Sequence, residues 1–98
     1  MSHRPALELI AVERAAHISR EGWTPEHDDK HANGDLARAA SVYALNAASP
    51  IYRTDGDPWL WPWDRSWFKP TNRIRDLVKA GALIVAEIER LQRKDPNP

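Results

Sequence analysis

The stretch "TNRIRDLVKAGALIVAEIERLQR", residues 71–93, carries the clearest secondary-structure signal in the chain. Its apolar residues recur at three- and four-residue intervals, which predicts an amphipathic helix. Thr71 follows Pro70 and is a suitable N-cap for it. We predict that one apolar stripe of this helix faces the core: Ile74, Leu77, Val78, Gly81, Val85 and Ile88.

The opposite side of this predicted helix carries charges at i, i+3 spacing. Asp76 with Lys79, and Glu87 with Arg90, are expected to be solvated pairs that contribute a few tenths of a kcal/mol each. Leu83 lies alone among them. A single exposed leucine is ordinary on a protein surface; the alternative is that Leu83 marks a contact between subunits.

Two more helices are predicted upstream. Residues 5–21 lie between Pro5, which suits a first helical turn, and Gly22, which suits a stop. Residues 34–48 lie between the turn signal Asn33-Gly34 and Pro50, with residues 22–33 predicted as a loop. The first helix has two apolar stripes and is expected to be contacted on both: Leu7, Ile10, Ala11 and Ile18 on one side, and Leu9, Val12 and Ala16 on the other.

Residues 49–70 contain four of the eight prolines and four of the five tryptophans, so regular helix is not expected there. Their aromatic content argues against disorder, because such a segment buries enough apolar surface to offset its ordering entropy. The predicted fold class is mostly α: a compact three-helix domain with a long Trp/Pro-rich loop wrapped on it. A short hairpin within residues 51–68 is the alternative for that loop.

Length and composition limit the class of protein. A chain of 98 residues is enough for one domain, 1–98, and we expect frayed ends at 1–4 and 94–98. Fourteen basic and fourteen acidic residues balance, so no nucleic-acid partner is expected. The chain has no cysteine, no apolar run of the ~20 residues that cross a bilayer and no signal-peptide pattern at its start. These features predict a cytoplasmic protein that does not enter the membrane.

Three blocks of sequence resemble a widespread family of small phage and prophage proteins. They are "EGWTPEHDDKHANGDLARAASVYA" (residues 21–44), "WPWDRSWFKP" (61–70) and "RDLVKAGALIVAEIERL" (75–91). Gly22-Trp23, Asp28 or Asp29, His31 and Tyr43 also resemble the pattern of the ryanodine receptor repeat domain, although Ala32 stands where that pattern has a proline. The second resemblance implies an adenine-nucleotide ligand, and the first transfers no activity.

Two segments carry the candidate chemistry. His27 and His31 are four residues apart with three aspartates nearby, a set that suits zinc or manganese if the segment is helical. The alternative is that these residues only cap and solvate a loop, and we predict no cofactor. Trp59, Trp61 and Trp63 alternate, so they are expected either to plug the core or to wall a pocket for a purine.

The sequence is therefore compatible with three functions. The first is a phage-encoded binding protein, a sponge that sequesters an adenine-containing immune signal. The second is an inhibitor or adaptor that binds a host or phage protein, and the third is a metal-dependent phosphohydrolase that uses His27, Asp28 and His31. No catalytic residues are assigned, and a homo-oligomer is expected. The predicted ligand-binding residues are Arg14, Trp23, His27, Asp28, His31, Tyr43, Trp63, Trp67, Lys69 and Arg73.

Overall fold

The computed structural model describes residues 4–31, 33–49 and 60–95. The predicted C-terminal helix is confirmed as α4, Arg73–Lys94. It begins one residue later than predicted, because the Asn72 side chain accepts a hydrogen bond from the backbone N–H of Arg75 at 2.9 Å. Thr71 instead donates its backbone N–H to the carboxylate of Asp76, at 2.8 Å. The mostly α fold class is confirmed.

The other two predicted helices are also present, as α1 (Ala6–Ser19) and α3 (Asp35–Ala48). The prediction of a loop over residues 22–33 was partly wrong, because a short helix, α2 (Pro25–Asp28), forms there. Thr24 caps α2 by accepting a hydrogen bond from the backbone N–H of His27 at 3.3 Å, and Pro25 fits its first turn. Local capping therefore makes a helix that hydrophobic periodicity does not reveal.

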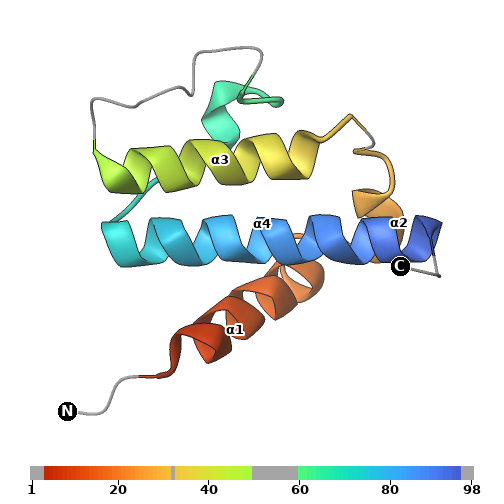
Figure 1. Cartoon of the computed structure of the whole chain (residues 1–98), viewed down its shortest axis with the longest axis horizontal. Helices are drawn as coiled ribbons and strands as arrows, with labels where there is room; N and C mark the ends of the chain where they lie inside the picture. The colour runs from red at the N-terminus through yellow and green to blue at the C-terminus, as the bar shows by residue number, and fades with distance from the viewer. Residues whose placement is uncertain (1–3, 32, 50–59, 96–98) are drawn as a thin grey trace.

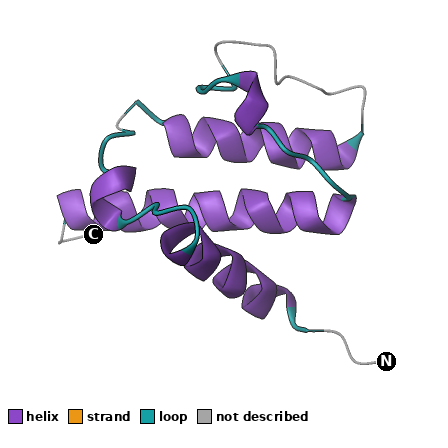
Figure 2. Cartoon of the chain, turned by 180° about the vertical axis from the view of Figure 1, so that it is seen from behind, coloured by secondary structure: helices purple, strands orange, loops and turns teal. Residues whose placement is uncertain are grey.

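All three other α-helices contact α4, which lies at the centre of the fold. α3 runs antiparallel beside α4, and α1 crosses the other flank at a steep angle so that its N-terminal end points away from the body (Figure 1). Seen from behind, α2 and the connection from α1 lie in front of α4 (Figure 2). One long side of α4 is thus free of the other three helices.

Small side chains bring α3 and α4 close together. Alanines from both helices are almost fully buried at their contact, where they allow the backbones to approach. Tyr43, Trp61 and Phe68 fill the space at one side of this contact. The main buried cluster consists of Leu36, Ala39, Ala40, Val42, Tyr43, Trp61, Phe68, Ala80, Leu83 and Ala86.

The predicted orientation of α4 was wrong for most of the stripe, although Val78 is buried as predicted. Ile74, Leu77 and Ile88 are 68%, 52% and 49% exposed, whereas Leu83 is buried at 3% and belongs to the core. Asp76 and Arg90, expected to be solvated, are buried as well. Asp76 satisfies its carboxylate with Thr71 and with the Asn46 side-chain amide, and Arg90 pairs with Glu87 at 2.6 Å. Alanine packing and satisfied polar groups therefore decided which face is buried.

α1 packs by a face that the apolar pattern did not predict. Its buried side chains are Arg14 and His17, while Leu7, Val12 and Ile18 remain exposed. Ile10 lies so close to Gly81 of α4 that a Cβ at position 81 would come within 2.7 Å of its Cδ1 atom. Glycine at position 81 therefore allows α1 to approach α4 closely.

Several predictions fall partly outside the described residues. Residues 60–95 and the other described ranges contain no strand, and the rest of the proposed 51–68 hairpin lies outside them. The predicted frayed ends lie outside them at 1–3 and 96–98, and Lys94 belongs to α4. None of the helices in the described ranges combines the length and the apolar character that crossing a membrane requires.

Candidate functional site

An aromatic pocket of about 510 Å³ lies where the end of α1, α2, α3 and residues 61–69 meet. Ligand pockets for drug-sized molecules are typically ~300–1,000 Å³ and are lined mainly by apolar and aromatic groups. Seven of the predicted ligand-binding residues line it: Trp23, His27, His31, Tyr43, Trp63, Trp67 and Lys69. The fold therefore brings together residues that are up to 46 positions apart in the chain (69 minus 23).

One wall of the pocket is a continuous row of ring contacts. The centroid distances are 4.6 Å for His17–Trp23, 5.9 Å for Trp23–His27, 4.9 Å for His27–His31, 5.2 Å for His31–Trp63 and 5.4 Å for Trp63–Trp61. The backbone N–H of Trp23 donates to the carbonyl oxygen of His17 at 2.9 Å. Gly22 makes that turn with φ +70°, a conformation that favours glycine. The turn after α1 thus places Trp23 at the start of the row.

Segment 61–69 supplies Trp61 and Trp63 of this row and also lines the pocket with Asp64, Trp67 and Lys69. The indole N–H of Trp61 donates to the backbone carbonyl of Asp64 at 3.0 Å, and the hydroxyl of Tyr43 accepts the backbone N–H of Lys69 at 3.0 Å. Burial raises the pKa of the Tyr43 hydroxyl. Asp64 caps the short 3₁₀ helix Arg65–Trp67, and the hydrogen bond from the Ser66 backbone lowers the pKa of its carboxyl. These bonds hold the segment in place and leave Trp67 52% exposed.

Two lysines line the pocket, each beside an aromatic ring. The Lys79 ammonium donates to the backbone carbonyl of Lys69 at 2.5 Å and lies 5.6 Å from the centroid of the Tyr43 ring. The Lys69 ammonium lies 5.8 Å from the centroid of the Trp67 ring. The pocket therefore offers positive charge next to aromatic rings, of which Trp67 is exposed and Tyr43 is buried.

Glu13 and His17 form the charged edge contributed by α1. Burial alone would raise the pKa of the Glu13 carboxyl, but the hydrogen bond and charge of Arg75, helped by His17 and Lys79, hold it below its usual value. Burial lowers the pKa of His17, although Glu13, 3.2 Å away, acts against this shift. The folded protein therefore favours an ionised Glu13 and a neutral His17.

We expect the free energy of unfolding to fall as the solution is acidified. Below a pH of about 6.5 the unfolded chain protonates His17 more readily than the folded protein does, and below about 4.5 the same holds for Glu13. Both pKa values are lowered in the folded protein. The stability that these two groups contribute is therefore fully present above pH about 6.5 and is lost in two steps, first as His17 and then as Glu13 becomes protonated. Urea titrations at pH 7.5 and 5.5 test the first range. His17→Gln should flatten that slope, and an unchanged slope would contradict the assignment.

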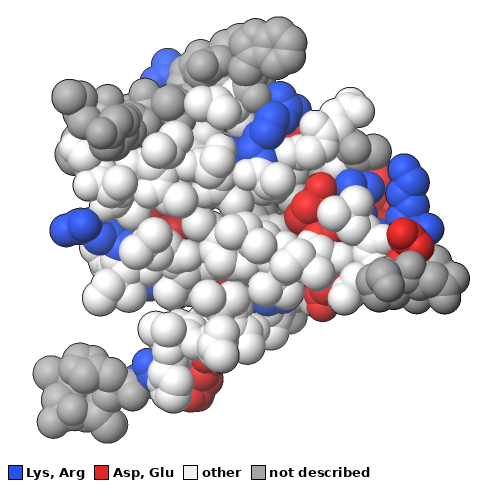
Figure 3. Space-filling model, in the orientation of Figure 1, with Lys and Arg blue, Asp and Glu red and all other residues white. Residues whose placement is uncertain are grey.

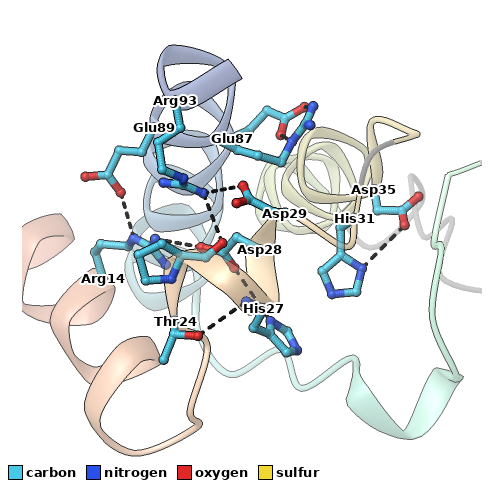
Figure 4. A network of polar contacts seen from close by, with 12 residues as sticks. Arg14, Thr24, His27, Asp28, Asp29, His31, Asp35, Glu87, Glu89 and Arg93 are labelled. Atoms are coloured by element: carbon cyan, nitrogen blue, oxygen red, sulfur yellow. Dashed lines mark hydrogen bonds and ion pairs between the residues drawn. The ribbon is translucent and has the colours of Figure 1, made fainter. Parts of the chain in front are cut away.

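Three predicted ligand-binding residues do not line the pocket. Arg14 and Asp28 form a buried ion pair at 2.7 Å, and Arg14 also reaches Glu89 at 3.0 Å (Figure 4). The Arg14 guanidinium is thus buried in ion pairs and does not line the pocket. Arg73 donates its Nε–H to the carbonyl oxygen of Ala47 at 2.9 Å. It caps the end of α3 and lies outside the pocket.

The residues of the predicted metal site are drawn toward separate partners (Figure 4). His31 lies 3.5 Å from Asp35, Asp28 binds Arg14, and the adjacent Asp29 pairs with Arg93 at 2.7 Å. Within residues 4–31, 33–49 and 60–95, no three histidine, aspartate or glutamate side chains are arranged to hold a metal ion. The phosphohydrolase hypothesis therefore has no ligand set in the part of the chain that the structure describes.

Some pocket residues were not predicted. Glu13 and His17 are four positions apart on α1, a spacing that places them on one helix face. The prediction for this helix used only its apolar residues, which lie on other faces. Lys79 was assigned to a solvated face, because the orientation of α4 could not be read from its apolar residues. Trp61 was one of several alternating tryptophans, and the sequence did not distinguish its buried ring from the exposed ring of Trp67.

Comparison of the chain with protein-family models, curated protein sequences and solved structures finds no match. The resemblances to phage and prophage proteins and to the ryanodine receptor repeat stay predictions.

Proposed function

We propose that this protein binds a planar anionic small molecule of the nucleotide class in the aromatic pocket. The observation that carries the proposal is the placement of two lysines beside aromatic rings, Lys69 beside the exposed Trp67 and Lys79 beside the buried Tyr43, in a pocket of about 510 Å³. A purine offers a flat face for stacking, and its phosphate offers charge for the lysines. The cavity has the volume of a typical small-molecule site.

The distribution of charge orients such a ligand. Lys69 and Lys79 line the pocket together with Glu13 and Glu21, and the charge of Lys79 also acts on Glu13. A phosphate is attracted to the ammonium groups and repelled by the carboxylates, so we expect it beside Lys69 and Trp67. The base and sugar are then directed toward Trp23, His31 and Trp63. There the polar groups of the base and sugar can form hydrogen bonds with the carboxylates and imidazoles that line the pocket.

The biological role that we propose is sequestration. The ligand would be an adenine-containing signal of bacterial immunity, held by a phage-encoded sponge in the host cytosol. This part rests on the sequence resemblance to phage and prophage proteins. The pocket chemistry supports binding without assigning a catalytic residue. The competing function is an inhibitor that uses Trp67, which is 52% exposed, as an anchor on another protein.

Calorimetry against adenine mononucleotides, other mononucleotides and cyclic dinucleotides tests the proposal. We expect Trp67→Ala to weaken binding of the preferred nucleotide by ~1–3 kcal/mol, the usual contribution of one base–aromatic stack. Arg73→Ala is the control, because Arg73 is exposed but lies outside the pocket. This variant should bind the nucleotide with the affinity of the wild type. Absence of binding across the panel, or equal affinity of the Trp67 variant, would contradict a nucleotide site and favour the protein-binding alternative.

A further inference from the structure

The side of α4 turned away from α2 carries a stripe of large aliphatic side chains. The exposed fractions are 68% for Ile74, 52% for Leu77, 49% for Ile84, 49% for Ile88 and 48% for Leu91. Figure 3 shows this side: charged residues gather toward its ends, and its middle is mostly free of them. Such a stripe on an otherwise charged protein is typical of a surface that another protein covers.

The spacing of the stripe identifies the kind of partner. Ile74, Gly81 and Ile88 are seven residues apart, and so are Leu77, Ile84 and Leu91. The two sets alternate at intervals of three and four residues, which is the a/d pattern of a coiled-coil seam. The partner that this seam fits is therefore another helix. Gly81 is the single position without a side chain, and Ile10 of α1 lies over it.

We propose that the partner is the α4 helix of a second copy of this chain, in antiparallel orientation. A two-fold axis between Gly81 and Ile84 would place Ile74 opposite Leu91, Leu77 opposite Ile88 and Gly81 opposite Ile84 of the second copy. Every layer then joins an a position to a d position. In the central layer Ile84 of one copy would pack against Gly81 of the other and against the Ile10 side chain that lies over that glycine. The stripe is thus complementary to itself, as a two-fold interface requires.

The stripe is long enough for a contact between two helices. It runs from Ile74 to Leu91, about 25 Å along the helix at ~1.5 Å per residue. Each partner of a standard interface buries about 800 Å². The pocket opens on the α2 side of α4, so the dimer would leave it accessible to a ligand.

Light scattering on the full chain provides the first test. We expect twice the monomer mass of 11.2 kDa. Ile84→Glu combined with Ile88→Lys should raise the dimer dissociation constant at least ~100-fold, and the i, i+4 charges keep the helix itself favourable. Leu7→Glu is the control, because Leu7 is 81% exposed on α1 and lies off the stripe. A wild-type monomer at high micromolar concentration, or a dimer that resists the double change, would overturn the proposal.

Cross-linking tests the orientation and does not depend on the folding of the charged variant. The chain has no cysteine, so single cysteines can be placed at chosen layers. Ile84→Cys lies near the axis and should join two copies through a short bis-maleimide. Ile74→Cys should not, because two such residues would lie about 25 Å apart at ~1.5 Å per residue. A mixture of Ile74→Cys and Leu91→Cys chains should cross-link, and efficient joining of two Ile74→Cys chains would overturn the antiparallel arrangement.

Discussion

Asp28→Ala is expected to lower the free energy of unfolding by about 3–5 kcal/mol, the typical cost of removing one partner of a buried ion pair. The Asp28 side chain is 1% exposed and that of Arg14 is 8% exposed, with 2.7 Å between their charged atoms. Without Asp28 the guanidinium stays buried and keeps only Glu89, whose side chain is 46% exposed. Since Arg14 joins α1 to α2 and α4, the loss should also loosen the docking of α1.

The adjacent carboxylate is a matched control. Asp29 also pairs with an arginine, Arg93, at 2.7 Å, but its side chain is 52% exposed. Asp29→Ala should cost no more than about 1 kcal/mol, because exposed pairs contribute little. Chemical denaturation of both variants measures the difference. Similar losses at the two positions would show that burial does not set the strength of the Arg14–Asp28 pair.

A double replacement separates two quantities: the net contribution of the ion pair to the free energy of unfolding, and the loss that follows when only one partner is removed. Arg14→Met with Asp28→Leu removes both charges and fills the space with apolar atoms, an exchange that is often neutral or stabilising in buried pairs. The double variant should therefore be clearly more stable than Asp28→Ala. If it is as unstable as the single variant, the network with Glu89 fixes α1 in a way that apolar contacts do not replace.

Trp61→Ala should destabilise the fold by about 3–5 kcal/mol, whereas Trp67→Ala should change stability by less than ~0.5 kcal/mol. Trp61 is 4% exposed, contacts Tyr43 and Phe68, and donates its indole N–H to Asp64. Trp67 is 52% exposed, so its truncation leaves no internal cavity. The two tryptophans are six residues apart and chemically identical, so the comparison isolates their positions.

Thermal and urea unfolding of both variants measures this difference. The Trp67 variant should retain the helical circular dichroism of the wild type, so any loss of ligand affinity in it reports on the pocket. A large loss of stability in both variants would place Trp67 in the core and remove the basis for its proposed stacking role. A small loss in both would contradict the central place of Trp61.

Much of the secondary structure follows from the sequence alone. The apolar periodicity of residues 71–93 requires a helix whichever face is buried, and the Asn33-Gly34 and Pro50 signals bound α3 within a residue or two. The seven predicted ligand-binding residues that line the pocket all come from the two segments that carry the candidate chemistry, 21–44 and 61–69. Large aromatic side chains in a small chain need a common place to be buried.

The tertiary structure alone decided which face each helix buries. In α4 the most apolar residues remain exposed, because α3 needs alanines for close approach and because Asp76 and Arg90 find partners that offset their desolvation. For the same reason a charged residue, Arg14, anchors α1 while Leu7 is exposed. Most of the residues that pair with these buried charges lie far away along the chain. Helical periodicity therefore predicts which residues share a face of a helix, but not which face the neighbouring helices cover.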